Sequence, residues 1–483
     1  MFRLSHTNSF SRALRGWSSQ TSCLAQCRRH AQQSALTRVD AFGPLTEIEK
    51  IMMGSIRATG PLSFATYMQL CLSHPVHGYY MNPKHAVFGT RGDFTTSPEI
   101  SQVFGELMAV WMLEQWMTTT PSMPFRIVEL GPGRGTLMDD ILRVFRQLPA
   151  ARAKLTSIHL VETSPAMRTL QGSKLLSSVQ NNSLKLVWYD ALDEVPRSRD
   201  TYTMLVAHEF FDALPVHVIE KTPRGWHEVL IAPSTDHSIR YTTPDPGSTG
   251  SVLPTSSSSI PPKPPTSSSR WTPVLSPTPT ASAALLGNAS PRFSKLPVGS
   301  RIEVSGAGVK SARSVADLIG SDGGEESASG CALIVDYGAE HAVGNSLRVR
   351  CSLCSCGLWI GFKDHKIVDI FHRPGECDIT ANVDFALLKE SLGPHVTPLG
   401  TLRQGEFLNR MGIQLRTASL IRAATTPERR KVIEEGVNRL VDPLGMGGQY
   451  AVLGITSNKK VGPRDQGVWP FVDVEASASS TQA

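Results

Sequence analysis

The sequence predicts an α/β fold in which a mostly parallel β-sheet carries helices on both faces. From Phe125 onward, short apolar runs alternate with amphipathic helical stretches, a pattern typical of such a sheet. A glycine-rich turn at residues 131–135 joins the first of these strands to the first helix. With 483 residues, 40% of them hydrophobic, the chain can bury one large core or two ordinary ones.

The region before Phe125 predicts an added N-terminal helical region. Residues 45–116 show two helical patterns separated by a loop that is rich in Gly, Pro, Thr and Ser. The end of this loop, Ser97-Pro98-Glu99, is a typical helix start. It combines a capping hydroxyl, a proline at the first helical position and an acid in the first turn.

The alternating region predicts strands and helices in a regular order. Up to the fourth strand, the predicted elements are strand 125–130, helix 136–148, strand 158–163, helix 164–175, strand 184–190 and strand 201–211. Further along, the patterns predict strand 331–338, helices 379–393, 402–413 and 425–443, and a last strand at 449–456. One domain would then cover residues 45–456, with a flexible polar tail at 457–483.

Residues 232–297 interrupt this pattern with a composition dominated by Ser, Thr and Pro. Such a segment buries too little apolar surface to offset its ordering entropy, so we expect it to be disordered. It separates two strand-like pieces, 226–231 and 301–305, that could pair with each other. We therefore expect a loop expanded within one domain, because loop closure becomes only slowly more costly with length. A linker between two domains is the alternative.

The net charge is concentrated at the N-terminus. The formal charge is +6, and residues 1–39 hold six arginines with no lysine and no acid. From Asp40 onward the chain is formally neutral, which gives no electrostatic support for nucleic-acid binding. No apolar run is long enough to cross a bilayer, so we expect no membrane span.

Residues 1–39 resemble a targeting segment. They are rich in Arg, Ser and Gln and lack the hydrophobic centre of a secretory signal, as is typical of a mitochondrial transit peptide. We therefore expect delivery to the mitochondrial matrix, with an ordinary basic tail as the alternative. The eight cysteines are scattered, so we expect reduced thiols.

The glycine turn discriminates between cofactors. Its glycines are Gly131, Gly133 and Gly135, whereas dinucleotide enzymes need the spacing G-x-G-x-x-G. Glu129, just before the turn, would repel a pyrophosphate but suits the cationic amino group of a methionine moiety. Glycines at such a crossing let the backbone approach a ligand closely, outside the carboxyl ends of the strands.

Acidic residues at the ends of the next two strands extend this interpretation. Glu162 follows the second strand, where a carboxylate can accept hydrogen bonds from both ribose hydroxyls. Asp190 ends the third strand, where it could reach an adenine amino group. Together with the turn, these residues predict S-adenosyl-L-methionine as the cofactor; a purely structural turn is the alternative.

Several motifs in order resemble the MidA family. They are GDFTTSPEIS, VELGPGRGTLMDDILR, VETSP, EFFDALPVHV, IVDYG, GFKDHK, DITANVDF and GQYAVLGI. The resemblance spans about Leu45 to Thr456, without the Ser/Pro-rich insertion. It implies a class I (seven-strand, Rossmann-like) S-adenosylmethionine-dependent methyltransferase fold.

The resemblance also implies an activity. Mitochondrial members of the family are protein arginine methyltransferases that act in complex I assembly. It therefore implies symmetric dimethylation of an arginine on a core peripheral-arm subunit of complex I, and it leaves a homodimer open. The cofactor-binding residues that it implies, together with Asp190 from the strand pattern, are Glu129, Gly131, Gly133, Gly135, Glu162, Asp190, Gly92, Asp93, Thr96 and Ser97.

The acceptor side can be argued from chemistry. A guanidinium is cationic at physiological pH, so it needs a carboxylate fork that grips it and directs one nitrogen at the methyl group. Glu209 and Asp212 follow the fourth strand, at the edge where substrates usually enter. We expect these two residues to be that fork. In the alternative interpretation Asp212 only braces the following turn, and Phe210 and Phe211 are core.

The sequence departs from the family pattern in two places. His208 stands where the family usually has Asn; it is bulkier and can be charged, which puts the inner geometry in doubt. Residues 349–360 are an additional segment with the pattern C-x-x-C-x-C. No fourth ligand accompanies these cysteines locally, so we expect no metal site. We interpret the segment as a retained intron, since the codon of its first residue, Val349, begins with GT as an intron does.

Two other functions are open at this point. One is an S-adenosylmethionine-binding assembly chaperone for complex I without efficient turnover. The other is a methyltransferase for RNA or a small molecule. The neutral body weighs against RNA, and the acids after the fourth strand suit a cation better than a neutral amide or base nitrogen.

Overall fold

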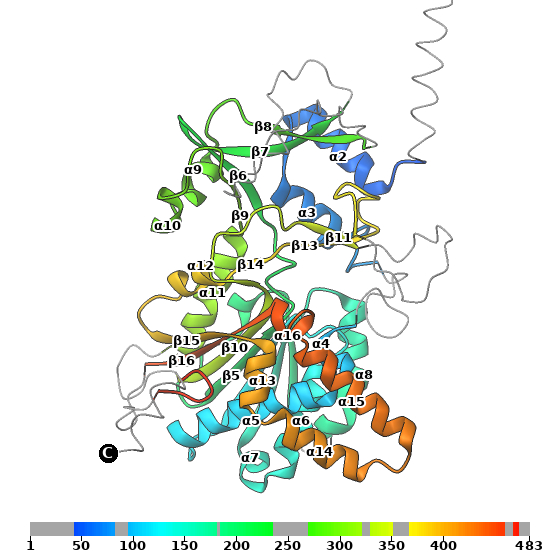
Figure 1. The fold of residues 1–483 in the computed structure, drawn as a ribbon, viewed down its shortest axis with the longest axis vertical. Helices are drawn as coiled ribbons and strands as arrows, with labels where there is room; N and C mark the ends of the chain where they lie inside the picture. The colour runs from blue at the N-terminus through cyan, green and yellow to red at the C-terminus, as the bar shows by residue number, and fades with distance from the viewer. Residues whose placement is uncertain are drawn as a thin grey trace, which may run out of the picture.

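The computed structural model places two lobes one above the other (Figure 1). It describes residues 43–82, 95–180, 184–234, 269–320, 329–350, 367–458 and 467–472. The lower lobe is built on an eight-stranded sheet and the upper lobe on a five-stranded one. In the described part of the chain, no helix is both long and apolar enough to cross a membrane.

The lower lobe contains the predicted sheet. Along the sheet the strands follow the order β15-β16-β10-β5-β2-β3-β4, and β14 pairs with the end of β10. Their bounds are β2 Phe125–Leu130, β3 Leu155–Val161, β4 Lys185–Tyr189, β5 Tyr202–His208, β10 Gly330–Ala339, β14 Val383–Asp384, β15 Val396–Arg403 and β16 Tyr450–Ser457. Neighbours from β4 to β10 are parallel, and β16 is antiparallel to both β10 and β15.

This topology is the expected seven-strand α/β sheet, with one reversed strand. The first strand, β2, lies in the middle, and the chain continues to β3 and β4 on one side before it crosses to β5 on the other. A cleft opens at such a switch point, outside the carboxyl ends of the strands. The sheet alone therefore fixes where a ligand binds.

Helices cover both faces of this sheet. One face packs on α5 Gln102–Thr119, α6 Thr136–Gln147, α13 Gln404–Arg410, α14 Ile413–Ala423 and α15 Pro427–Val441. The other face packs on α11 Gly306–Ile319 and α12 Phe385–Ser391. The remaining helices of the lobe are α4 Ser97–Ile100, α7 Pro149–Lys154, α8 Pro165–Gln180, the 3-10 turn η1 Leu192–Glu194 and α16 Met446–Gln449.

The upper lobe combines two early helices with strands from the middle of the chain. Its sheet has the order β1-β7-β6-β9, and β8 also pairs with β7. The bounds are β1 Leu62–Ser63, β6 His217–Thr222, β7 Gly225–Pro233, β8 Trp271–Leu275 and β9 Arg301–Val304. Helices α2 Glu47–Thr59 and α3 Phe64–Ser73 pack with this sheet around one apolar core. A small sheet of β11 Arg348–Arg350, β12 Ile367–Val368 and β13 Asp378–Thr380 lies beside them.

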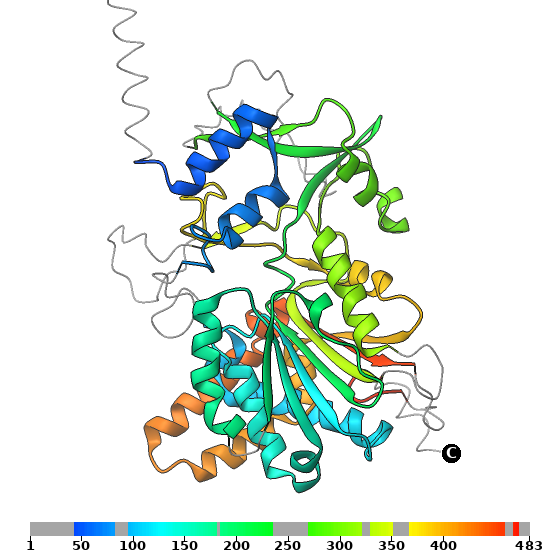
Figure 2. The ribbon, with the colours of Figure 1, turned by 180° about the vertical axis from the view of Figure 1, so that it is seen from behind.

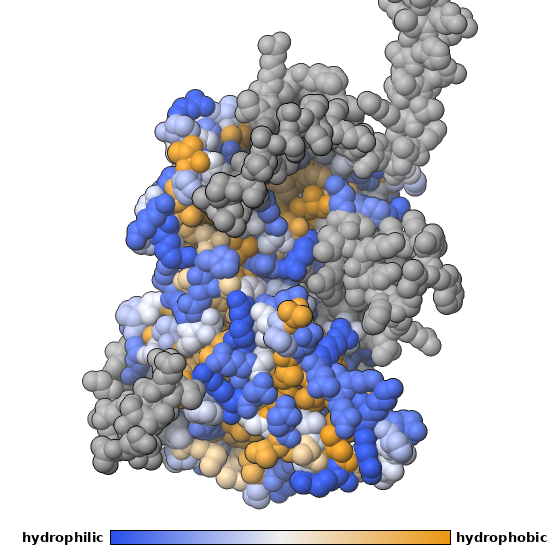
Figure 3. Space-filling view, viewed as in Figure 1, coloured by the Kyte–Doolittle hydropathy of each residue, from blue (hydrophilic) through white to orange (hydrophobic). Residues whose placement is uncertain are grey.

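The two lobes meet where the central strands end. Seen from behind, those strands converge toward the upper lobe (Figure 2). On the face shown in Figure 3, hydrophilic residues surround separate hydrophobic patches over the lower lobe. The carboxyl ends of the parallel strands, where open α/β sheets bind ligands, therefore lie at the junction between the lobes.

The prediction of disorder over residues 232–297 is wrong at both ends of that range. Strand β7 extends to Pro233. Residues 269–297 contain β8, α9 Ala281–Leu286 and α10 Pro291–Ser294. The physical reason is a set of apolar side chains within the Ser/Pro-rich composition: Trp271, Val274, Leu286 and Phe293 are buried. Pro273 is tolerated in β8 because the strand pairs only with β7, and an edge strand can spare one N–H. Residues 235–268 lie outside the described residues.

Two smaller expectations also change. The strand pieces at 226–231 and 301–305 do not pair with each other, because β6 lies between β7 and β9. The residue that caps the short helix α4 is Thr96 rather than Ser97, and its side chain makes no capping bond. Ser101 then caps the long helix α5 by accepting a hydrogen bond from the N–H of Val103.

Candidate functional site

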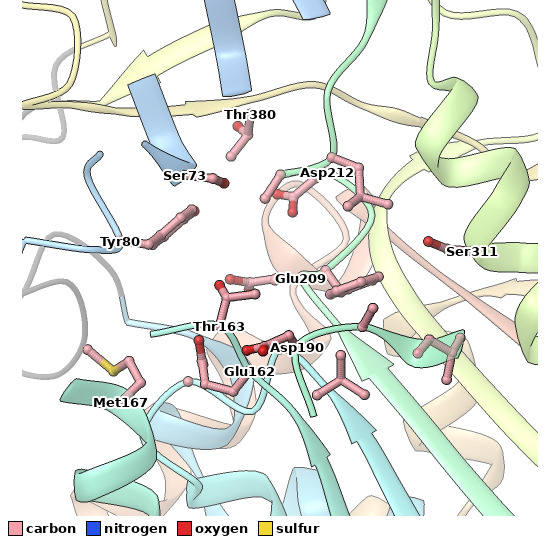
Figure 4. A pocket seen from close by; sticks show the side chains of 18 of the residues that line it. Ser73, Tyr80, Glu162, Thr163, Met167, Asp190, Glu209, Asp212, Ser311 and Thr380 are labelled. Atoms are coloured by element: carbon pink, nitrogen blue, oxygen red, sulfur yellow. The ribbon is translucent and has the colours of Figure 1, made fainter. Parts of the chain in front are cut away.

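Two cavities lie at the carboxyl ends of the central strands. The larger, of about 350 Å³, extends from Glu162 and Asp190 in the lower lobe to Ser73 and Tyr80 in the upper lobe. The smaller, of about 50 Å³, lies over the glycine turn. Gly131, Gly133 and Glu209 line both cavities, so they form one continuous site. Figure 4 shows Glu209 between the strand-end residues below and the upper lobe above.

The glycine turn needs residues without side chains. Gly131, Gly133 and Gly135 have φ of +63°, +50° and +78°, a backbone region that glycine enters without steric cost. A Cβ on Gly131 would lie 3.1 Å from the Phe210 ring. The N–H of Gly131 also donates to the carbonyl of Val161 at 3.0 Å. The turn is thereby fixed against β3 with its backbone open to the cavities.

Glu129 supplies an unsatisfied carboxylate at the floor of the smaller cavity. It is only 3% exposed, and its Oε2 has no hydrogen-bond partner within the described residues. Burial, and to a smaller extent the charge of Asp140, raises the pKa of Glu129 to about 8. A buried, unpartnered carboxylate is costly unless a ligand satisfies it. Its chemistry fits the cationic amino group of S-adenosyl-L-methionine.

Glu162 is held at the end of β3 by several hydrogen bonds. The N–H of Ser164 donates to its Oε1 at 2.8 Å, and Nε2 of Gln171 donates to its Oε2 at 3.2 Å. The same Gln171 nitrogen donates to the carbonyl of Gly133 at 2.7 Å, and Trp188 Nε1 donates to Gln171 Oε1 at 2.8 Å. Burial raises the pKa of Glu162. Gln171, which sequence reasoning missed, thus joins the glycine turn to the second acidic strand end.

The remaining predicted cofactor residues divide into three groups. Asp190 lines the larger cavity and pairs with Arg168 at 2.5 Å. Thr96 lines the smaller cavity, but Ser97 is buried away from both, with its hydroxyl donating to Gln404 at 3.2 Å. The structure therefore does not bring the Ser97 side chain to either cavity, and its role in cofactor binding stays a prediction. Gly92 and Asp93 lie outside the described residues.

Glu209 stands in a conformation that residues other than glycine rarely adopt. Its φ is +50°, a strain worth about 1–3 kcal/mol that persists only where the surroundings impose it. Its N–H donates to the carbonyl of Val335 at 3.0 Å, and the Tyr450 hydroxyl donates to its Oε1. The result is a carboxylate aimed into the site between the two cavities.

Asp336 supports the turn that follows Glu209. It is fully buried at the end of β10, and its Oδ2 accepts hydrogen bonds from the N–H groups of Phe211 and Asp212 at 2.9 and 3.2 Å. Burial and the charge of Glu209 raise the pKa of Asp336 to about 8, while its backbone donors favour the ionised form. Asp336 therefore holds the turn that carries both predicted acceptor residues.

Asp212 and the upper lobe complete the acidic wall. Asp212 is buried, lines the larger cavity, and its carbonyl accepts from the N–H of Ala381 at 2.9 Å. Across from it, Tyr80 donates to Asp378 Oδ1 at 2.7 Å, and both line the same cavity. Sequence reasoning missed Tyr80, Asp336, Asp378 and Tyr450 as site residues, although the last three fall in motifs that carry the family resemblance.

His208 is neutral in this environment. Burial lowers its pKa to about 3. Among the residues that the structure describes, its Nε2 has no hydrogen-bond partner, and it lies 3.8 Å from Glu209 Oε1. Its ring packs edge-on to Phe104 and parallel to Tyr450, at 5.0 and 6.0 Å between centroids. The charged histidine considered from sequence is thus disfavoured, and the residue acts as a packed aromatic beside the acceptor carboxylate.

The cysteine-rich segment falls largely outside the described residues. Val349 and Arg350 belong to β11, and residues 351–366 are not described. Within the described part of the chain, no group of three or more His, Cys, Asp or Glu residues could hold a metal ion. Cys71, Cys331 and Cys377 are buried and form no disulfide with one another.

The sequence is similar to a known family of proteins. A family model described as a putative S-adenosyl-L-methionine-dependent methyltransferase matches residues 107–400. A relative from Danio rerio named "Protein arginine methyltransferase NDUFAF7, mitochondrial" is 34% identical over 438 residues, which is 87% of this chain and 89% of the relative. The protein of that name from Homo sapiens is 32% identical over 87% of this chain and 86% of the relative.

Solved structures agree on the fold. A likely methyl transferase from Burkholderia thailandensis, crystallised with S-adenosyl-homocysteine, superposes with a TM-score of 0.63. The match covers 92% of this chain and 98% of that one, at 21% sequence identity. The two-lobed architecture is therefore shared with a methyltransferase-like protein over almost its full length.

Proposed function

The chain belongs to the family of S-adenosyl-L-methionine-dependent methyltransferases, and from this premise we propose that it methylates an arginine of a protein substrate in the mitochondrial matrix. The family fixes the cofactor as S-adenosyl-L-methionine. The relatives are named mitochondrial protein arginine methyltransferases, which supports both the arginine substrate and the compartment. Following the MidA resemblance, we propose a core peripheral-arm subunit of complex I as the substrate and symmetric dimethylarginine as the product.

The observation that carries the proposal is the acidic lining of the acceptor side. Glu209, Asp212 and Asp378 all line the larger cavity, next to the glycine turn. A guanidinium is always protonated at physiological pH, and paired carboxylates bind it through directed, charge-assisted hydrogen bonds. A cationic acceptor complements the negative charge that these three carboxylates bring to the cavity, whereas a neutral amide or base does not.

We assign the cofactor to the glycine turn and the strand-end acids. Glu129 would take its ammonium group, the backbone of Gly131 and Gly133 would approach its methionine portion, and Glu162 would accept the ribose hydroxyls. When bound, the cofactor supplies an electrophilic methyl group on a sulfonium. The residues of the chain then contribute positioning and exclusion of water, which are the main aids to an in-line displacement.

The acceptor residues position one nitrogen and take up a proton. Glu209 and Asp212 grip the guanidinium and direct one terminal nitrogen toward the methyl group. One N–C bond would form as the methyl–sulfur bond of the cofactor breaks, which would leave a neutral thioether, and one N–H proton would be lost, because the methylated guanidinium keeps a single positive charge. Glu209 is the nearest carboxylate that can take that proton, and it returns the proton to water through the open side of the cavity. Tyr450 and Asp336 keep Glu209 in place throughout.

Methyl transfer to mitochondrial matrix protein tests the proposal. The chain from Asp40 onward is incubated with labelled S-adenosyl-L-methionine and matrix extract that lacks the endogenous enzyme, and labelled residues are mapped by mass spectrometry. We expect label on an arginine of one complex I subunit. Fragmentation of the product distinguishes symmetric from asymmetric dimethylarginine.

Two variants separate the parts of the site. Gly133→Val should abolish cofactor binding, because a β-branched residue is strained at a φ of +50°. Glu209→Gln should keep the cofactor affinity and lower kcat/KM by about 10- to 100-fold, the value of one charged hydrogen bond of about 1.5–3 kcal/mol. Cofactor binding by the unmodified chain without any transfer would instead support the non-catalytic chaperone.

A further inference from the structure

A second, oppositely charged cavity adjoins the acceptor site. It has a volume of about 230 Å³ and shares Tyr337 with the larger cavity described above. Its polar lining includes His341, Arg348, Asn382, Arg403 and Gln449. We call it the arginine-lined cavity. No Asp or Glu occurs among its described lining residues, whereas the acceptor side is lined by three carboxylates.

Of the two arginines that line this cavity, Arg403 is more available to bind a ligand than Arg348. It is exposed, and its Nη1 donates to the carbonyl of Gly338 at 2.8 Å, which fixes one edge of the guanidinium. Among the residues that the structure describes, none of the ion pairs involves Arg403. Its remaining N–H groups are therefore placed at the cavity with one edge already anchored, as bidentate recognition of a carboxylate needs.

Arg348 is fixed beside it. Its guanidinium lies 5.5 Å from the centre of the Tyr337 ring, its Nε donates to the carbonyl of Ser346 at 3.2 Å, and its Nη2 donates to Asn382. The buried Glu303 lies close enough to feel the charge of Arg348, so part of that charge is compensated. Arg348 shapes the cavity, and Arg403 supplies most of its uncompensated charge.

Tyr337 links the two cavities through a short chain of contacts. Its ring packs on Tyr450 with 3.9 Å between centroids, and Tyr450 donates to Glu209. The Tyr337 and Tyr450 rings therefore lie between Glu209 and the arginine-lined cavity. A substrate arginine held at Glu209 would be close to that cavity. An extended chain advances about 3.3 Å per residue, so a few residues bridge that separation.

We propose that the arginine-lined cavity binds an acidic side chain of the substrate protein, a few residues along the chain from the arginine that is methylated. The proposal rests on the proposed function, because it deepens the recognition of the same substrate. Charge complementarity argues for a carboxylate: the acceptor cavity selects the cation, and the arginine-lined cavity selects the neighbouring anion.

Synthetic peptides test this directly. Each peptide carries one arginine in a Gly/Ala background, with a single glutamate at each position from four residues before to four residues after it. The matched peptides carry glutamine instead. Methyl transfer is measured with the full chain and S-adenosyl-L-methionine. At one or two positions on one side, we expect glutamate to lower KM about five- to tenfold relative to glutamine while kcat stays unchanged.

A pair of variants assigns the effect to the cavity. Arg403→Gln keeps a donor for the Gly338 carbonyl but removes the charge, and it should abolish the advantage of glutamate. Arg422→Gln, at an exposed position on α14, should retain that advantage. Equal KM values for all glutamate and glutamine peptides, or an advantage that survives Arg403→Gln, would overturn the proposal.

Equilibrium binding separates this proposal from the proposed function. If no peptide is methylated, fluorescent versions are bound to the full chain with S-adenosyl-L-homocysteine. An Arg403-dependent preference for glutamate still supports the cavity's role, and equal binding overturns it. A third experiment adds inorganic phosphate and measures thermal stability. If phosphate stabilises the chain only when Arg403 is present, and the glutamate and glutamine peptides bind equally, the cavity binds a free anion and the substrate role is overturned.

Discussion

Single buried carboxylates determine how the site responds to pH. Glu129 has one unpartnered oxygen, and its pKa is raised to about 8, first by burial and then by Asp140. A carboxyl group with a raised pKa binds its proton more tightly in the folded state than in the unfolded state. Without cofactor, the stability that Glu129 contributes is therefore present below its ordinary pKa and is lost as pH rises toward about 8.

The same raised pKa makes cofactor binding depend on pH. A bound ammonium favours ionised Glu129, so binding releases a proton at neutral pH. We predict that the affinity for S-adenosyl-L-methionine rises between pH 6 and about 7.5, by at most about tenfold per pH unit for one released proton. The affinity should fall again once the cofactor's own amino group, with an ordinary pKa of about 7.7–8.0, loses its charge.

Isothermal titration calorimetry in buffers with different ionisation enthalpies measures both the affinity and the released proton. Glu129→Gln should weaken binding by about 10- to 100-fold and flatten the rising limb. A native protein whose affinity is constant over this range, with no proton released, would show that Glu129 does not face the ammonium group.

At the scale of secondary structure, the turn after β5 depends on a residue of β10. Asp336 accepts from the N–H groups of Phe211 and Asp212, which follow Glu209 in the turn. We predict that Asp336→Asn lowers kcat at least tenfold and the free energy of unfolding by about 1–3 kcal/mol, because an amide nitrogen would face backbone donors. Cofactor affinity, which depends on β2 and β3, should change less than about twofold.

The matched control is Asp384→Asn. Asp384 is buried and caps α12 through the N–H of Leu387 at 3.0 Å. An asparagine can still cap α12, but it loses the charge that Arg292 Nη2 contacts at 3.0 Å, so this variant should lower the free energy of unfolding by about 1–3 kcal/mol and leave kcat unchanged. Equal losses of kcat in the two variants would reduce the role of Asp336 to general stability.

The connection between β7 and β8 tests whether the Ser/Pro-rich region is a loop within one lobe. Ser234 Oγ donates to the carbonyl of Ser269 at 2.9 Å although the two are 35 positions apart. We predict that replacing residues 235–268 by a short turn keeps methyl transfer and raises the free energy of unfolding by up to about 2 kcal/mol, because shorter loops cost less entropy to close. Chemical denaturation measures the change. A chain that no longer folds would contradict this account.

Local patterns predicted the parts of the fold and site that depend on neighbours in sequence. The glycine turn, the acids Glu129 and Glu162, and the strand–helix alternation are all visible within a few residues. Strand β8 was missed because composition averages over a segment and hides single buried residues such as Trp271. The supports of Glu209 were missed for another reason: Tyr450 and Asp336 are distant in sequence, and only the pairing of β5 with β10 and of β10 with β16 brings them together.

At the scale of the whole molecule, the substrate site is shared between the lobes. The lower lobe provides Glu162, Glu209 and Asp212, and the upper lobe provides Ser73 and Tyr80. The upper lobe therefore forms part of the cavity that we propose as the acceptor site. Ser73, Tyr80 and Thr380 lie on the side of the cavity opposite Glu162 and Asp190 (Figure 4).

The location of the whole protein is expected to depend on residues 1–39. We predict that residues 1–39 fused to a fluorescent protein direct it to the mitochondrial matrix, because the membrane potential draws a basic amphipathic segment inward. Replacing the six arginines with glutamine should leave the fusion in the cytosol. Fluorescence microscopy with a matrix marker decides between these outcomes, and matrix import of the arginine-free version would refute the targeting role of those charges.

The central claim is that paired carboxylates hold a guanidinium for methylation, and a matched substrate pair tests it most directly. The complex I subunit that receives label is prepared in two forms, with its target arginine intact or replaced by lysine, and each is incubated with the chain and labelled S-adenosyl-L-methionine. We predict label on the arginine form alone, reduced by about 10- to 100-fold in Glu209→Gln. Equal labelling of the lysine form, or transfer to arginine that is indifferent to Glu209, would contradict the claim.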